Sequence, residues 1–169
     1  MLVPSFVIGH GQQKLIMEKV LTQASSLDEG SHQVVVHQPS IGGVANALRV
    51  HRQTPAMNSR DGKRLLRKLL NRSICSVKVA AILRCEDKVV AVGWNHIGFD
   101  GLGMHAEADC LRRVNLRRLQ ASTLYVAAER KRNGRAVKAR PCPDCERLIR
   151  GLAVGRVLWR DSDGEWRDL

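Results

Sequence analysis

From Ser59 onward, apolar runs alternate with amphipathic segments in an order that few folds accept. Helical spacing occurs at residues 59–73, 104–119 and 142–152, and strand-like runs occupy 77–83, 89–95, 122–130 and 155–161. The order is helix, strand, strand, helix, strand, helix, strand. This order predicts an α/β fold with helices on both faces of a mixed sheet. Right-handed crossovers should make the last three of these strands run in the same direction.

Two turns refine this topology. The polar segment "RCEDK" (84–88) separates the first two strands and predicts a hairpin. Near the C-terminus, Asp163-Gly164 predicts a tight turn into a short last strand, Glu165–Leu169. So short a turn forces antiparallel pairing, because a parallel partner needs a long crossover. We therefore expect a sheet of four to five strands that ends in a short antiparallel strand.

Residues 1–58 are weakly patterned and predict an N-terminal extension of unknown role, followed by one domain over 59–169. Helical spacing in Gln12–Leu27 and an apolar run at Val34–Val36 are the exceptions. The four histidines of this segment lack metal-ligand spacing, so we expect them at the surface. The opening "MLVPSFVIG" has no positive n-region, and no apolar run approaches the ~20 residues of a membrane span. We expect a soluble, cytoplasmic protein without membrane contacts.

The charge of the chain indicates a polyanionic partner. Lysine and arginine number 28 against 16 acidic residues, and the formal net charge is +12. Such an excess predicts attraction to nucleic acid, to nucleotide phosphates or to an anionic surface. The simpler interpretation is a basic protein that contacts nucleic acid without performing chemistry. Charge alone does not distinguish such a binding protein from an enzyme that acts on its polyanionic partner.

The cysteines suggest a metal site. Five are present, an odd number, in a chain longer than disulfide scaffolds. Cys142 and Cys145 share one face of the first turn of a predicted helix, where Pro143 suits the first helical position. His105 opens the other helix that follows a strand. Both helix starts lie at carboxyl ends of strands, where sites form in α/β sheets. One histidine and two cysteines are suitable zinc ligands.

Other interpretations of the C-x-x-C pair remain. It could be a redox couple, or part of a closed structural zinc site with a fourth ligand. Cys110 points about 140° away from His105 around its helix, and Cys75 and Cys85 are of the kind more often buried as small hydrophobic residues. Three ligands leave one tetrahedral position open for water, which marks a catalytic site. Glu107 is placed to sit beside that water and move its proton.

The two motifs together resemble a known family. His105-Ala106-Glu107 followed by Pro141–Cys145 matches the H-x-E and P-C-x-x-C signature of the zinc-dependent nucleoside and nucleic-acid deaminases. The resemblance covers about Ser59–Arg160 and implies the three-layer cytidine deaminase-like α/β fold. The "GWN…HAE" segment is most similar to tRNA adenosine deaminases and deoxycytidylate deaminases. The predicted antiparallel ending instead resembles the free-cytidine and toxin-type branches.

The resemblance implies roles for the signature residues. His105, Cys142 and Cys145 would bind Zn²⁺, and Glu107 would be the general acid and base. The backbone N–H groups of Ala106 and Cys142 would line the reacting centre. Dimers or tetramers of identical chains are expected by the same analogy.

Three further residues are candidate substrate contacts. Asn95 resembles the family asparagine that contacts sugar or base, although a plain turn residue is the alternative. Trp94 and Phe99 are placed to stack on a base, and a core position is the alternative for Trp94.

One segment departs from the family pattern. Arg130–Arg140 separates the third strand from the cysteine motif and contains six basic residues but no acid. Asn133-Gly134 predicts a hairpin turn. We expect this basic hairpin to stand beside the site and contact phosphate or polynucleotide; a solvated loop is the alternative. The candidate contacts are Lys131, Arg132, Arg135, Lys138 and Arg140.

The sequence therefore predicts a zinc-dependent hydrolytic deaminase that converts cytosine to uracil in a nucleotide or single-stranded nucleic acid. The alternatives are an adenosine deaminase acting on tRNA or another nucleic acid, and a catalytically silent deaminase-like binding protein.

Overall fold

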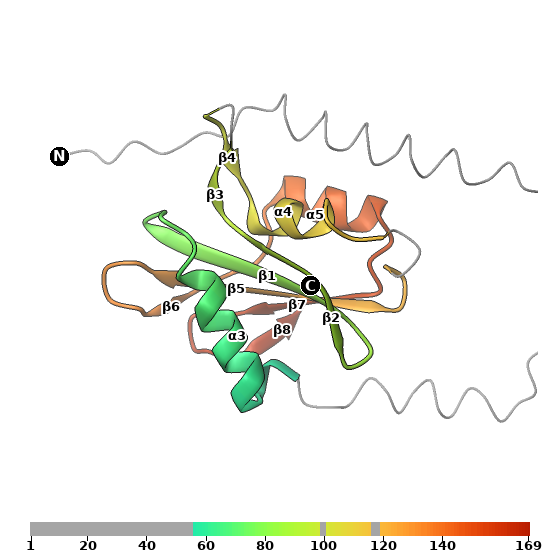
Figure 1. Ribbon diagram of the computed structural model, residues 1–169, viewed down its shortest axis with the longest axis horizontal. Coiled ribbons are helices and arrows are strands. Elements are labelled where there is room, and N and C mark those ends of the chain that lie inside the picture. Colours follow the sequence, from blue (N-terminus) through green and yellow to red (C-terminus); the bar gives the residue numbers. More distant parts are fainter. Residues whose placement is uncertain (1–55, 99–100, 116–118) are drawn as a thin grey trace, which may run out of the picture.

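The computed structural model describes residues 56–98, 101–115 and 119–169. In these residues six strands form one sheet in the order β2-β1-β5-β7-β8, with β6 paired to β5 (Figure 1). Two short strands pair separately as β3 and β4. The strands of the main sheet are β1 (Val77–Cys85), β2 (Lys88–Trp94), β5 (Ser122–Arg130), β6 (Ala136–Val137), β7 (Arg156–Arg160) and β8 (Trp166–Asp168).

The strand directions confirm the predicted topology. β1 pairs antiparallel with both β2 and β5, so β2 and β5 run the same way. β5 and β7 are parallel, and β8 returns antiparallel to β7. The sheet is larger than the predicted four to five strands, because the basic segment after β5 folds back as β6. The sequence analysis also missed the β3 (His96–Ile97) and β4 (Gly103–Met104) pair.

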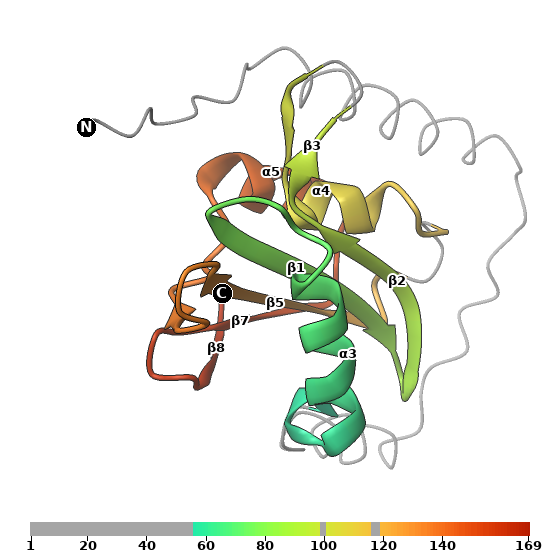
Figure 2. The ribbon, with the colours of Figure 1, turned by 60° about the vertical axis from the view of Figure 1, so that its left-hand side comes forward.

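Helices cover both faces of the sheet, as expected. α3 (Arg60–Leu70), which follows a short 3-10 helix at Ala56–Asn58, lies on one face. α4 (Ala106–Leu111) and α5 (Pro143–Gly151) lie on the other. Figures 1 and 2 show α3 separated from the α4 and α5 pair by the strands. The protein therefore has three layers.

The sequence explains why α3 forms and which side it buries. The Ser59 hydroxyl caps its N-terminus by accepting a hydrogen bond from Gly62 N at 3.0 Å. Leu66, Leu69 and Leu70 are buried against the sheet, and each such side chain contributes about 1.5–3 kcal/mol. Met57 packs into the same cluster at 1% exposure, so the buried core reaches two residues into the stretch that the sequence assigns to the extension.

One predicted helix is shorter than its pattern indicates. Helical spacing extends over residues 104–119, but α4 ends at Leu111. The N–H of Arg112 bonds to Ala108 O and that of Arg113 to Cys110 O, and there the helix closes. Leu119 is buried in the core from beyond the helix, which accounts for the misleading apolar spacing.

Two earlier predictions, for residues 12–27 and 34–36, fall outside the described residues. Within the described part of the chain, none of the helices has the length and apolarity to cross a membrane.

Candidate zinc centre

Three potential ligand atoms converge where α4 and α5 begin. His105 Nδ1 lies 3.2 Å from the Sγ of Cys145 and 3.5 Å from the Sγ of Cys142. All three atoms lie within 4.8 Å of one another. A tetrahedral zinc ion with typical bond lengths separates a nitrogen and a sulfur ligand by about 3.6 Å. The residues present therefore fit a zinc ion, with one coordination position left for a non-protein ligand.

The backbone fixes two of these ligands at helix starts. His105 is the residue before the first turn of α4, and Cys142 holds the same place before α5, both in extended conformation. Pro143 occupies the first turn of α5, where its missing N–H leaves no helical bond unmade. Cys145 follows one turn later on the same face, which brings both sulfurs to one point.

The two thiols are electrostatically unequal. A hydrogen bond from Cys145, assisted by His105, lowers the pKa of Cys142 to about 3. The same hydrogen bond and burial raise the pKa of Cys145. The hydrogen bond with Cys142 also raises the pKa of His105. The lowered pKa of Cys142 favours its thiolate, the form in which cysteine binds metal.

Glu107 is the acidic partner of the cluster. Its side chain is hydrogen-bonded to Cys145, and the residue is only 5% exposed. Burial raises the pKa of this carboxyl group, which favours a group that both accepts and returns a proton. The carboxylate is not among the three clustered ligand atoms, so it is available for proton transfer.

A close helix–strand contact positions α4, and the sequence analysis did not identify it. A Cβ on Gly93 would lie 2.3 Å from Ala106 O and 2.4 Å from Cys110 N. Glycine therefore lets the backbone of α4 lie directly on β2. Ala91, also buried, faces the same cluster. Small residues at alternate positions of "VAVG" are the signal that could have revealed this contact.

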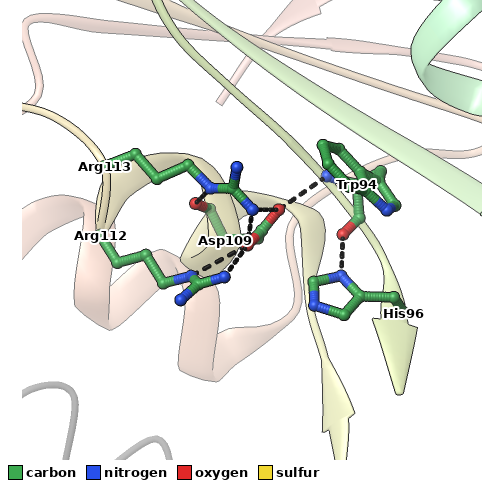
Figure 3. Close-up of polar contacts among 5 residues, drawn as sticks. All are labelled: Trp94, His96, Asp109, Arg112 and Arg113. Atoms are coloured by element: carbon green, nitrogen blue, oxygen red, sulfur yellow. Dashed lines mark hydrogen bonds and ion pairs between the residues drawn. The ribbon is translucent and has the colours of Figure 1, made fainter. Parts of the chain in front are cut away.

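Asp109 is the second residue that the sequence analysis missed. Its carboxylate is fully buried and accepts hydrogen bonds from Arg112, Arg113 and the backbone N–H of Trp94 (Figure 3). These contacts tie α4 to the end of β2, so Asp109 acts as a positioning residue for the helix that carries Glu107. No sequence pattern marks it beyond an acid in the first turns of a helix.

Asn95 lies at the end of β2, where its side chain serves the backbone of the neighbouring strand. Oδ1 accepts from Val79 N and Ser73 Oγ, both at 2.7 Å, and Nδ2 donates to Val77 O at 2.8 Å. The amide fixes the start of β1 against β2. A substrate contact by Asn95 therefore stays a prediction.

The aromatic candidates are placed differently. The Trp94 ring packs with the α3 cluster, on the sheet face opposite the zinc ligands. The guanidinium groups of Arg72 and Arg113 lie 4.8 Å and 5.1 Å from its centroid. Ala106, fully buried, is the first residue of α4 beside the ligands. Phe99 lies outside the described residues.

The basic segment forms the predicted hairpin. β5 and β6 pair antiparallel, and Gly134 takes the positive φ (66°) that the turn requires. The hairpin leads directly into the cysteine ligands. Three of the five candidate cations are engaged: Lys131 with Ile74 O, Lys138 with the Trp159 ring and Arg140 with Glu146, while Arg132 and Arg135 are exposed.

The chain is similar to solved structures that include the following three. A dCMP deaminase from cyanophage S-TIM5, in apo form, is 21% identical, with a TM-score of 0.46 over 66% of this chain and 89% of that one. The same enzyme in complex with dCMP and dUMP is 22% identical, with a TM-score of 0.46, and the match covers 67% of this chain and 90% of that one. A cytidine deaminase from Burkholderia pseudomallei is 19% identical, with a TM-score of 0.45, and the match covers 63% of this chain and 87% of that one. No curated protein matches the chain.

A protein-family model matches more than half of the chain. The model that describes the cytidine and deoxycytidylate deaminase zinc-binding region matches residues 60–160. The match spans α3 to β7 and includes all three candidate zinc ligands and Glu107. The protein therefore belongs to the cytidine and deoxycytidylate deaminase family of zinc-binding proteins.

Proposed function

We propose that this protein hydrolyses the exocyclic amine of a cytosine base, producing uracil and ammonia, on a nucleotide or single-stranded nucleic acid. One observation carries the proposal: a buried carboxyl group, Glu107, lies against a three-ligand cluster that leaves a coordination position open. A purely structural zinc site has no use for this carboxyl group.

His105, Cys142 and Cys145 would hold the zinc ion. Zinc bound there supplies a water molecule that is acidic enough to react at neutral pH. The protein's own residues would exclude bulk water and transfer the protons. Burial of Glu107 excludes bulk water from the place where a proton must be handed over.

Glu107 would move the protons. It would accept one from the attacking water as the oxygen bonds to C4 of the cytosine ring. It would then deliver protons to the base, so that the C4–N bond breaks and the amine leaves as ammonia. One water is consumed, one ammonia is released, and the carboxyl group returns to its starting state. A polynucleotide substrate must present its target base unpaired or flipped out of the stack.

Two features support a substrate that contains a cytosine base and carries phosphate. The antiparallel β8 is the ending that resembles the free-cytidine and toxin-type branches more than the tRNA branch. The excess of 12 positive charges favours a substrate that carries phosphate.

A substrate panel tests the proposal. Zinc-loaded protein would be incubated with cytidine, deoxycytidylate, adenosine, single-stranded DNA and tRNA, with ammonia release and product mass as readouts. We expect uracil from at least one phosphate-bearing cytosine substrate, and none with Glu107→Ala. Hypoxanthine as the product would support the adenosine deaminase alternative. No turnover despite bound zinc would support a silent binding protein.

A further inference from the structure

The exposed cations of α3 lack acidic partners in the described part of the chain. Between positions 60 and 72 the sequence has one acid, Asp61, and six cations. All six are exposed, and none takes part in an ion pair among residues 56–98, 101–115 and 119–169. They are Arg60, Lys63, Arg64, Arg67, Lys68 and Arg72.

The preceding sequence does not supply the missing negative charge. Residues 1–55 contain three acids, Glu18, Asp28 and Glu29, against four cations. Their net charge is positive, so the segment as a whole does not offset the positive charge of residues 60–72. A surface with this charge attracts external anions.

A groove runs beside two of these cations, on the sheet face opposite the zinc ligands. It has a volume of about 530 Å³ and lies between α3, the β5–β6 hairpin and the β7–β8 turn. Lys63 and Arg67 line it from α3, and Arg160 lines it from the end of β7. Cations from two elements thus converge on one hollow.

The rest of the lining suits a nucleic acid strand. Trp166 forms part of the wall, held by a hydrogen bond to Asn58 at 3.1 Å and by an edge contact with Tyr125. A fixed aromatic ring between cations is the combination that single-stranded nucleic acids use, with phosphates on cations and bases on rings. Two carboxylates also line the groove; Glu129 is paired with Lys78, and Glu165 is the other.

The spacing of the α3 cations favours a polymer over a single phosphate. Lys63 and Arg67, which line the groove, are four residues apart, so two positive charges are spaced about 6 Å along the helix axis. A membrane surface fits less well, because a helix that binds lipid needs its apolar face free. The apolar face of α3 is buried on the sheet.

We propose that the groove between α3, the β5–β6 hairpin and the β7–β8 turn binds the phosphodiester backbone of a single-stranded nucleic acid. This site is separate from the zinc centre but close to it along the chain. Ala139 N donates to Arg160 O in the groove wall, and Cys142 follows three residues later, at most about 11 Å of extended chain.

A matched pair of double variants tests the site. Lys63→Gln/Arg67→Gln removes two charges from the groove. Lys88→Gln/Arg150→Gln removes two exposed charges elsewhere, from β2 and from α5. Both would be made in full-length protein with Glu107→Ala, so that binding is measured without turnover. The probes are fluorescent 20-mers of DNA and of RNA, and phosphatidylserine vesicles.

We expect the groove variant to weaken oligonucleotide binding at least tenfold and the control variant to change it less than about twofold. The slope of log K against log salt should fall by about 1.4 for the two lost contacts on a single strand. Unequal losses for DNA and RNA would identify the sugar that the groove prefers. Glu165→Gln should tighten binding, because it removes a negative charge from the lining.

Three results would overturn the proposal: equal weakening by both double variants, no binding of either oligonucleotide, or vesicle binding that alone depends on Lys63 and Arg67. Zinc content and thermal unfolding of the groove variant should equal those of its parent. This control separates failure of the groove from failure of the zinc centre, since the deaminase proposal stands or falls on turnover.

Discussion

The helices on the two faces of the sheet differ in how their positive charges are paired. On the α4 and α5 face, five arginines form ion pairs with acids of the two helices. On the other face, the five cations of α3 and Arg72, two residues beyond its end, form no ion pair with the described residues. Ion pairing restrains the five arginines on the α4 and α5 face, whereas the unpaired cations of α3 are available to a partner. The difference indicates a precise chemical site on one face and a binding surface on the other. The paired arginines are Arg112, Arg113, Arg140, Arg147 and Arg150.

Among the tests of this comparison, removing a zinc ligand should have the largest effect. Cys142→Ala takes one of three ligands from the cluster, so we expect bound zinc to fall from about one ion per chain to near zero. Elemental analysis of purified protein measures this ratio. Cys85→Ala, at the far end of β1, is the matched control and should keep its zinc. Equal zinc in both variants would contradict the assigned ligands.

The second-largest effect should come from adding a methyl group where α4 contacts β2. Gly93→Ala places a methyl group 2.3 Å from Ala106 O, and overpacking of this kind costs about 1–3 kcal/mol or more. Denaturant unfolding measures the loss, and zinc affinity should fall with it because α4 carries His105. Gly151→Ala, where a Cβ meets nothing within 4 Å, should be neutral or slightly stabilising. Similar behaviour of the two variants would show that the close approach is unimportant.

Disrupting the Asp109 contacts should have a smaller effect. Asp109→Asn removes the charge that Arg112 and Arg113 share, and we expect a loss of about 1–3 kcal/mol in unfolding free energy. The arginines are 44% and 40% exposed, so they can turn to water, which limits the cost. Asp144→Asn breaks an exposed pair with Arg147 and should cost at most about 1 kcal/mol. A larger loss at Asp144 than at Asp109 would contradict this ranking.

The smallest effect on stability should come from α3. Lys63→Gln/Arg67→Gln removes charges that no described residue pairs with, so the unfolding free energy should stay within about 0.5 kcal/mol of wild type. Thermal unfolding in low salt is the measurement. A clear loss of stability would mean that these cations have a structural partner and would weaken the contrast between the faces.

The sequence predicted the zinc centre better than its surroundings, for physical reasons. Two helix starts that follow parallel strands must meet at one sheet edge, so His105 and Cys142 could be brought together without a structure. The antiparallel β8 followed from the Asp163-Gly164 turn in the same way. These predictions rest on short-range rules of chain geometry.

Side-chain placement required the structure. The alternation of small and large residues in β2 sends Gly93 to α4 and Trp94 to α3. The sequence analysis did not use this alternation and left Trp94 as either a base-stacking residue or a core residue. The hydrogen bonds of Asn95 join residues 16 and 22 positions apart, which local patterns do not reveal. The absence of acidic partners for α3 among the described residues likewise depends on the tertiary arrangement.

The central claim is that Glu107 performs proton transfer beside a zinc ion that it does not bind. The most direct test is Glu107→Gln, with zinc content and ammonia release measured on the same sample with the best substrate. We predict that zinc stays at about one ion per chain while turnover falls by about 10²–10⁴-fold. Turnover within tenfold of wild type, or loss of zinc together with activity, would contradict the claim.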